Sequence, residues 1–190
     1  MDDLKLTIME RMKTIRTVKQ LNLDQASEMT GISKAMLSQI ERGQSMPTIT
    51  TLWKISTGYK VPLTYFLEKA SSDNTVTDIT DMEPVYEEDK KMRTYTLVPY
   101  NPAQNFEMLY IEFDPHCVHR SSKHISGVEE YIFVQSGQLE LELNAETVKI
   151  IEKQCFRFRA DVAHGYINTS ERVCGIINLI VYPLVMPVDR

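Results

Sequence analysis

The segment from Gly31 to Gly43 constrains the fold of this chain more than any other part of the sequence. Gly31 can end one helix in the left-handed conformation, and Ser33 can cap the next helix two residues later. Within that second helix Leu37 and Ile40 fall on one face, while the opposite face is short and polar. Two short helices joined by a tight turn predict a helix-turn-helix motif, whose second helix suits the major groove of DNA.

Capping residues mark the neighbouring helices. Asn22, with Gln25 three residues later, forms a capping box that satisfies backbone donors at the start of the first motif helix. Thr48 is expected to cap the helix that follows the motif, and Thr48 and Thr51 are placed to touch phosphate from its start.

The polar face of the second motif helix carries the residues expected to contact DNA. Gln is suited to bidentate contact with adenine and Lys to guanine or phosphate, so Lys34 and Gln39 are the expected base readers. The full predicted DNA-binding set is Asn22, Ser33, Lys34, Ala35, Ser38, Gln39, Arg42 and Thr48. The alternative is an ordinary helical hairpin in an all-α domain.

The residues in and after this motif resemble the XRE family of five-helix, lambda-repressor-like DNA-binding domains, over about residues 4–68. The matching segments are 33–43, 46–48, 52–55, 61–63 and 66–67. The resemblance implies a largely buried ion pair between Arg16 and Glu41 that fixes the DNA-reading helix. Trp53 is expected to pack in the core-facing stripe of the fourth helix.

Charge divides the 190 residues into two parts. The whole chain carries −5, but residues 1–69 carry +3 and residues 70–190 carry −8. Positive charge therefore accompanies the helix-turn-helix, in a chain long enough for two small domains. Because +3 is modest, one copy should bind DNA weakly, and a homodimer on two half-sites is expected.

An acidic stretch separates the two parts. Residues 70–89 hold seven Asp or Glu and no Lys or Arg, which is typical of a linker, with an extended segment around residues 82–86. The predicted domains are therefore 1–69 for DNA binding, a linker over 70–92, and a second domain over 93–190.

Features of membrane and secreted proteins are missing from the sequence. No stretch approaches the roughly 18 apolar residues of a spanning helix, and the first residues do not resemble a secretory signal, so a cytoplasmic location is expected. Cys117, Cys155 and Cys174 share no close spacing, which disfavours a disulfide framework or zinc knuckle. We expect them to be small buried apolar residues.

Strand-length apolar runs dominate the sequence from Arg93 onward. These β-branched or aromatic runs are 94–100, 106–113, 130–135, 138–143, 146–151, 155–159 and 172–182. Seven or more short strands without helices predict an all-β sandwich or closed barrel.

Two histidine-containing clusters lie among these strands. The first runs from His124 through Glu130 to Gly137, and the second from His164 to Asn168. Together they resemble the two motifs of the cupin superfamily, jelly-roll (double-stranded β-helix) barrels, over about residues 93–183. The resemblance implies a divalent metal held by His124, Glu130 and His164. Such a donor set suits zinc first, or iron, manganese or nickel.

The sequence also departs from the cupin pattern. Ser122 stands where the first motif usually has a histidine, so one ligand is absent, and His116 and His119 upstream are candidate substitutes. The alternative to a metal is a pair of histidines satisfied by hydrogen bonds in an empty binding barrel. Asn168 is expected to be a structural hydrogen-bond donor.

An XRE domain followed by a cupin barrel resembles bacterial regulators that sense a small molecule, most closely those tied to sulfur and amino-acid utilisation. The resemblance suggests an amino-acid effector, sulfur-containing in the leading hypothesis. Arg120, Lys123 and Tyr166 are the predicted effector-binding residues. Arg157 and Arg159 are further cations, which strand alternation favours placing in solvent.

Three classes of function fit these observations. The leading one is an effector-responsive transcriptional regulator that binds double-stranded operator DNA as a homodimer. The second is a metal-dependent cupin enzyme, a dioxygenase or isomerase, with a DNA-targeting domain, which the missing histidine disfavours. The third is a regulator whose barrel only dimerises the chain. The operator, the effector and the direction of regulation are open at this point.

Overall fold

The computed structural model describes residues 2–67, 76–144 and 146–184, and parts of the predicted linker and C-terminal region, 70–75 and 185–190, lie outside the described residues. The chain forms two compact units. The helical unit comprises 1–71, 99–105 and 183–190, and the barrel unit comprises 72–98 and 106–182. Helices followed by two antiparallel sheets confirm the predicted fold class.

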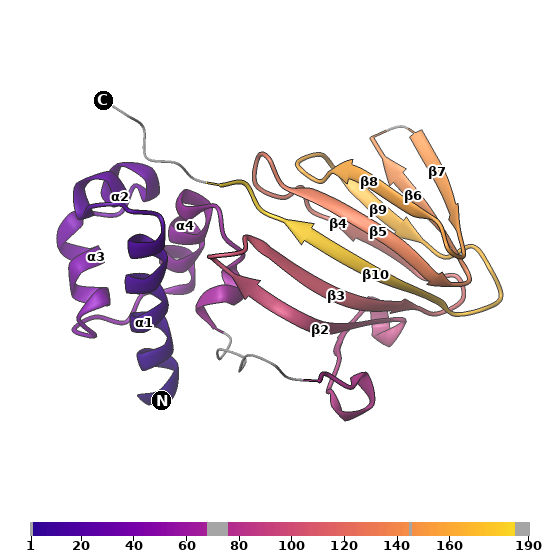
Figure 1. The fold of residues 1–190 in the computed structure, drawn as a ribbon, viewed down its shortest axis with the longest axis horizontal. Helices are drawn as coiled ribbons and strands as arrows, with labels where there is room; N and C mark the ends of the chain where they lie inside the picture. The colour runs from indigo at the N-terminus through magenta and orange to yellow at the C-terminus, as the bar shows by residue number, and fades with distance from the viewer. Residues whose placement is uncertain (1, 68–75, 145, 185–190) are drawn as a thin grey trace. The chain divides into compact units, whose positions relative to one another are not determined.

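Three helices of the helical unit begin directly after the predicted caps, and the first of these three ends at the predicted glycine. They are α1 (Asp2–Val18), α2 (Leu23–Thr30), α3 (Lys34–Glu41), α4 (Ile49–Tyr59) and the 3-10 turn η1 (Leu63–Phe66) (Figure 1). The capping box of Asn22 and Gln25 is present, and Gly31 ends α2 with φ at 66°. Side chains of Ser33 and Thr48 cap α3 and α4. The predicted fifth helix corresponds to η1.

Apolar residues from every helix meet in one core. The largest fully buried side chains of the unit are Ile8, Met12, Ile15, Leu37, Ile40, Ile55, Tyr59, Tyr65 and Phe66. Gly58 lets α4 approach α2 closely, since a Cβ there would lie 2.6 Å from the backbone oxygen of Met29. Burial of each large side chain contributes about 1.5–3 kcal/mol, which holds α3 in place.

The described residues after 76 form ten strands and two short 3-10 turns, which make up the barrel unit apart from the last residues of β2. The strands are β1 (Val85–Glu87), β2 (Met92–Asn101), β3 (Phe106–Phe113), β4 (Val118–Ser121), β5 (Glu129–Ser136), β6 (Gln138–Leu143), β7 (Glu146–Ile151), β8 (Cys155–Arg159), β9 (His164–Ile167) and β10 (Cys174–Val181), and the turns are η2 (Ile79–Asp81) and η3 (Glu88–Lys90). One sheet has the order β1-β2-β3-β10-β5-β8 and the other β4-β9-β6-β7. Strand β1, within the predicted linker, pairs with β2.

Alternating residues of the two sheets form the barrel core. Buried side chains from the six-stranded sheet include Ile111, Phe113, Ile132, Val134, Ile176 and Ile180, and those from the four-stranded sheet include Leu139, Leu141 and Ile150. Glu130 on β5, Asn178 on β10 and His164 on β9 are polar exceptions in this core. None of the helices among the described residues has the length and apolar character needed to cross a membrane.

Candidate DNA-binding surface and metal site

The outward face of α3 presents the predicted DNA-reading residues to solvent. Lys34, Ala35, Gln39 and Arg42 are exposed and Ser38 is half-buried. The ammonium of Lys34 lies 2.8 Å from the carboxylate of Asp24. Both side chains of that pair are more than half exposed, so the pair contributes little stability and can be exchanged for a contact to DNA.

A bidentate ion pair anchors α3 to α1. Arg16 Nε lies 2.6 Å from Glu41 Oε1 and its Nη2 lies 2.8 Å from Oε2, while Nη1 donates to the carbonyl of Leu21 at 3.0 Å. The hydrogen bond to Glu41 is the main cause of a raised Arg16 pKa. This geometry confirms the ion pair that the resemblance implies, and it fixes the orientation of α3.

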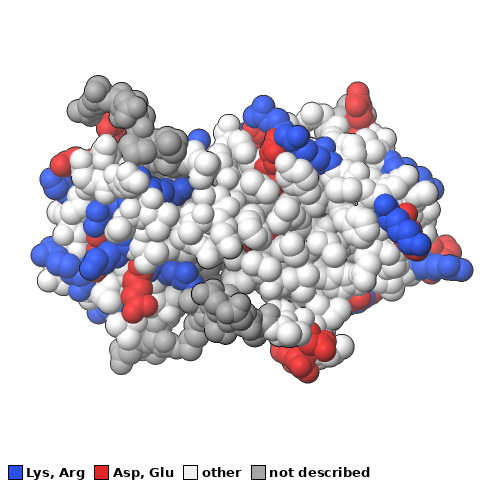
Figure 2. All heavy atoms as spheres, in the orientation of Figure 1, with Lys and Arg blue, Asp and Glu red and all other residues white. Residues whose placement is uncertain are grey.

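Three predicted DNA-binding residues are helix caps. Asn22, Ser33 and Thr48 are exposed at the starts of α2, α3 and α4, and each side chain accepts a backbone N–H of its own helix. Helix starts favour anions because unpaired N–H groups point outward. Figure 2 shows Lys and Arg side chains on the visible face of the helical unit, along its α3 side.

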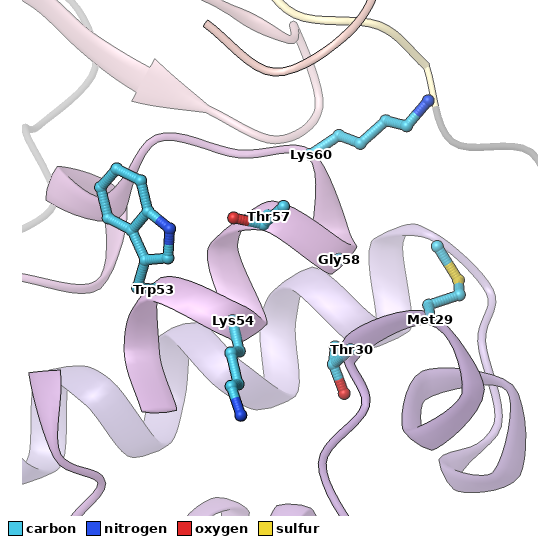
Figure 3. Close-up of a pocket in the computed structure, with 7 residues that line it drawn as sticks. All are labelled: Met29, Thr30, Trp53, Lys54, Thr57, Gly58 and Lys60. Atoms are coloured by element: carbon cyan, nitrogen blue, oxygen red, sulfur yellow. The ribbon is translucent and has the colours of Figure 1, made fainter. Parts of the chain in front are cut away.

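Trp53 is not a core residue, so its predicted position is wrong. Its side chain is 64% exposed and projects from α4 near Thr57 (Figure 3). The buried stripe of α4 runs through Leu52, Ile55 and Tyr59, and Trp53 lies one position outside it. Trp53 lines an open groove with Met29, Thr30, Lys54, Thr57, Gly58 and Lys60.

Three predicted metal ligands converge inside the barrel. His124 comes from the loop after β4, Glu130 from the six-stranded sheet and His164 from the four-stranded sheet. Glu130 Oε1 lies 2.9 Å from His124 Nε2 and 3.6 Å from His164 Nε2. Within the described ranges, these are the residues whose ligand atoms cluster closely enough to share an ion, all lying within 4.8 Å of one another.

The hydrogen bond of His164 suits metal binding. Its Nδ1 lies 2.8 Å from the carbonyl oxygen of Val162, and since a carbonyl only accepts, Nδ1 is the donor of this bond. The other ring nitrogen, Nε2, which holds the lone pair of a neutral imidazole with this hydrogen bond, is buried in the site and has no hydrogen-bond partner within the described part of the chain. Ligands of a tetrahedral ion at 2.0–2.1 Å lie about 3.4 Å apart, which is close to the 2.9 and 3.6 Å that separate Glu130 Oε1 from the two histidine nitrogens. The residues fit a divalent metal.

The two carboxylate oxygens of Glu130 have different partners. Oε1 faces the histidines, whereas Oε2 accepts hydrogen bonds from the Tyr166 hydroxyl and from Asn178 Nδ2, the latter at 2.7 Å. Burial raises the pKa of Glu130, but hydrogen bonds from His124, Tyr166 and Asn178 outweigh it and hold the pKa below its ordinary value. Asn178 escaped prediction, although it is a polar residue within an apolar strand.

The Tyr166 hydroxyl is held in its neutral, donating form. Burial, together with the nearby charge of Glu130, raises the pKa of Tyr166 well above its ordinary value. Tyr166, one of the predicted effector-binding residues, therefore lies against the metal site with its donor already committed to Glu130.

Other predicted residues of the barrel lie apart from this cluster. His116 pairs with Glu171 at 3.1 Å and His119 with Glu88 at 3.0 Å, so neither joins the three ligands. Asn168 donates to backbone carbonyls, including that of Phe113 at 2.9 Å, which confirms its structural role.

The candidate effector cations are all exposed. Arg120 pairs with Glu142 on the outside of the four-stranded sheet, opposite Gly165, whereas Lys123 lies in the loop next to His124. The remaining two cations, Arg157 and Arg159, also face solvent, as alternation predicts, and pair with Glu129 and Asp161 respectively.

The cysteines differ in exposure. Cys117 and Cys174 are buried, which raises their thiol pKa to about 11 and about 12 respectively. Cys155 is exposed at the start of the edge strand β8, so the expectation that it is buried is wrong.

Comparisons with known proteins agree with both units. A helix-turn-helix family model matches residues 12–66 and a cupin domain model matches residues 109–181. A DNA-reading helical unit joined to a cupin barrel defines the class as a helix-turn-helix transcriptional regulator.

Several known proteins match this chain over nearly their whole length. The chain is 35% identical to the HTH-type transcriptional regulator SutR of Escherichia coli K12, covering 96% of this chain and 99% of SutR. It is 24% identical to the regulator PuuR of the same organism, covering 94% and 96%. A crystal structure of an HTH_3 family transcriptional regulator from Vibrio cholerae is similar, with a TM-score of 0.55, 33% identity and coverage of 95% and 97%.

The chain therefore belongs to the family of HTH-type transcriptional regulators that carry a cupin domain. The relatives it matches are named as transcriptional regulators, and the chain is a regulator of this kind.

Proposed function

We propose that this chain is a cytoplasmic, homodimeric regulator that binds operator DNA and senses a small amino-acid-like molecule beside a divalent metal, with zinc as the first candidate. The observation that carries the sensing role is the buried Nε2 of His164, which lies beside Glu130 and His124 and has no hydrogen-bond partner among the residues that the structure describes. A nitrogen lone pair desolvated without a partner is costly unless something binds it.

The effector would complete the coordination of the metal. Three protein ligands leave a fourth position on a tetrahedral ion, which a carboxylate, amine or thioether of a sulfur-containing amino acid can occupy. Lys123, which is exposed and precedes His124 in the chain, would attract the carboxylate. The metal would supply Lewis acidity to hold the effector, and the residues around it would orient it.

DNA binding would use α3 in the major groove. Gln39 and Lys34 would read bases, and Arg42 and the helix starts at Asn22, Ser33 and Thr48 would hold phosphates, with Ala35 and Ser38 against the groove. The +3 charge of residues 1–69 favours two copies on a site with half-sites about one helical turn apart.

The DNA-reading role is tested by comparing two exposed residues of α3. The full chain would first select an operator from a randomised duplex pool, and binding would then be measured by fluorescence anisotropy at several salt concentrations. Gln39→Ala should cost about 1–3 kcal/mol on the operator only, because a base contact is lost. Arg42→Ala should weaken binding to all sequences and reduce the salt slope, because a phosphate contact is lost. Equal losses for Gln39→Ala on operator and random DNA would contradict the assignment.

A further inference from the structure

The outer face of the six-stranded sheet is apolar where solvent contact would favour polar residues. On β10, the buried Ile176, Asn178 and Ile180 alternate with Ile177, Leu179 and Val181, and these three are half-buried. An antiparallel strand with one solvated face normally alternates apolar and polar residues. Strand β10 is instead patterned like a strand covered on both faces.

Neighbouring strands continue this apolar face. Strand register aligns one row as Tyr110, Ile177, Phe133 and Cys155, and the next as Met108, Leu179, Tyr131 and Arg157. Tyr95 on β2 extends the first row, with its ring centroid 6.0 Å from that of Tyr110. Figure 2 shows that the surface over β3 and β10 is largely free of Lys, Arg, Asp and Glu. We call these residues the sheet face.

The four-stranded sheet has the alternating pattern expected of a solvent-exposed outer face. Its outer residues on β6 and β7 include Glu140, Glu142, Thr147 and Lys149, with Glu140 directly opposite Lys149. The contrast between the two sheets indicates that the sheet face is made to be covered.

Charges at the rim of the sheet face are already neutralised. Arg157 pairs with Glu129 at 2.6 Å, and Arg93 pairs with Glu112 at 2.9 Å. A rim of paired charges offers no excess cation to DNA. Paired charges do suit a twofold-symmetric interface, because there the same surface of two copies meets and unpaired charges of one sign would repel each other.

The size of the sheet face matches that of a stable dimer contact. Strands β3, β5 and β10 have eight residues each, and five strands from β2 to β8 lie side by side. At about 3.3 Å per residue and 4.8 Å between strands they cover roughly 600 Å² of flat surface, before side-chain relief is added. A standard interface takes about 800 Å² of accessible surface from each partner.

From the pattern, the neutral rim and the area, we infer that two copies of this chain dimerise by packing their sheet faces together. The inference rests on the proposed homodimer and specifies the surface that forms it. The occupant is a second copy because the centre of the face is apolar, the charges around it, Arg157 included, are already paired, and the area is that of a dimer contact.

The test is sedimentation velocity of the full chain at micromolar concentration without DNA. Wild type should sediment as a dimer. Leu179→Lys, which places a charge at the centre of the sheet face, should raise the dimer dissociation constant on the order of 100-fold and give a monomer. Thr147→Lys, on the outer face of the other sheet, is the matched control and should remain dimeric. Circular dichroism should show that both variants are folded.

If Leu179→Lys fails to fold, Phe133→Lys is the second variant. Phe133 is 37% exposed, so a lysine there can reach water in the monomer. A monomeric wild type, or dimers that persist in the folded lysine variants of the sheet face, would overturn the inference. If the lysine variants stay dimeric and wild type binds operator, the sheet face is not the dimer contact but the proposed function stands. If Leu179→Lys is monomeric and wild type binds no operator, only the DNA-binding proposal is overturned.

Discussion

At the scale of single residues, the candidate metal site depends on how one carboxylate is oriented. Glu130 can face both histidines with Oε1 because Tyr166 and Asn178 hold Oε2. Partners behind a ligand commonly change metal affinity 10–100-fold, because they keep the ligand in its binding geometry. Tyr166 and Asn178 are therefore positioning residues.

Tyr166→Phe should weaken metal binding about 10–100-fold while the fold is retained, since it removes only the hydroxyl that holds Glu130. Metal affinity would be measured by competition with a chelator of known affinity. Tyr131→Phe is the control, because it removes a comparable hydroxyl from the adjacent Glu129, 3.0 Å away and outside the site. Equal affinities in the two variants would show that Tyr166 does not position the ligand.

At the scale of helices and strands, local signals predicted the elements best. Caps at Asn22, Ser33 and Thr48 marked the helix starts because each satisfies backbone donors within a few residues of itself. The strands β4 and β9 escaped prediction because they are four residues long and contain His, Arg, Ser or Gly in place of an apolar run.

Longer-range features were less predictable. The exposure of Trp53 depends on a shift of one position around α4, and the role of Asn178 depends on a partner 48 residues away along the chain. The metal-ligand set of His124, Glu130 and His164 could be predicted only from the resemblance. These residues are up to 40 positions apart in the sequence, and no local pattern predicts that the fold brings them together. Their roles as metal ligands stay a prediction.

Packing of α4 on α2 gives a prediction at this scale. Gly58→Ala should destabilise the helical unit by about 1–3 kcal/mol, because its Cβ would lie 2.6 Å from the Met29 backbone oxygen and 2.7 Å from Thr30 Cα. The better helix propensity of Ala offsets at most about 1 kcal/mol. Thermal unfolding of the full chain would measure the loss, with the exposed neighbour Thr57→Ala as the control. Unchanged stability in Gly58→Ala would show that α2 can move aside.

At the scale of the whole molecule, regulation requires that the two units communicate. A ligand that binds two arrangements of the chain equally well does not change the equilibrium between them. An effector must therefore bind one arrangement more tightly to change the affinity for DNA. The predicted ligands His124, Glu130 and His164 all belong to the barrel unit, and the helix α3 predicted to read DNA belongs to the helical unit, which has a core of its own. The two proposed roles, sensing and DNA reading, can therefore be separated by mutation.

His164→Ala should remove bound metal and the effector response but leave effector-free operator binding within about tenfold of wild type. The reason is that the substitution deletes a buried ligand of the barrel while the core and charge of the helical unit stay intact. Metal content would be measured on the purified protein, and operator binding would be titrated with candidate amino acids, sulfur-containing ones first. His116→Ala, which changes an exposed histidine outside the cluster, should keep both metal and response. An effector response that survives in His164→Ala would place the sensor site elsewhere in the chain.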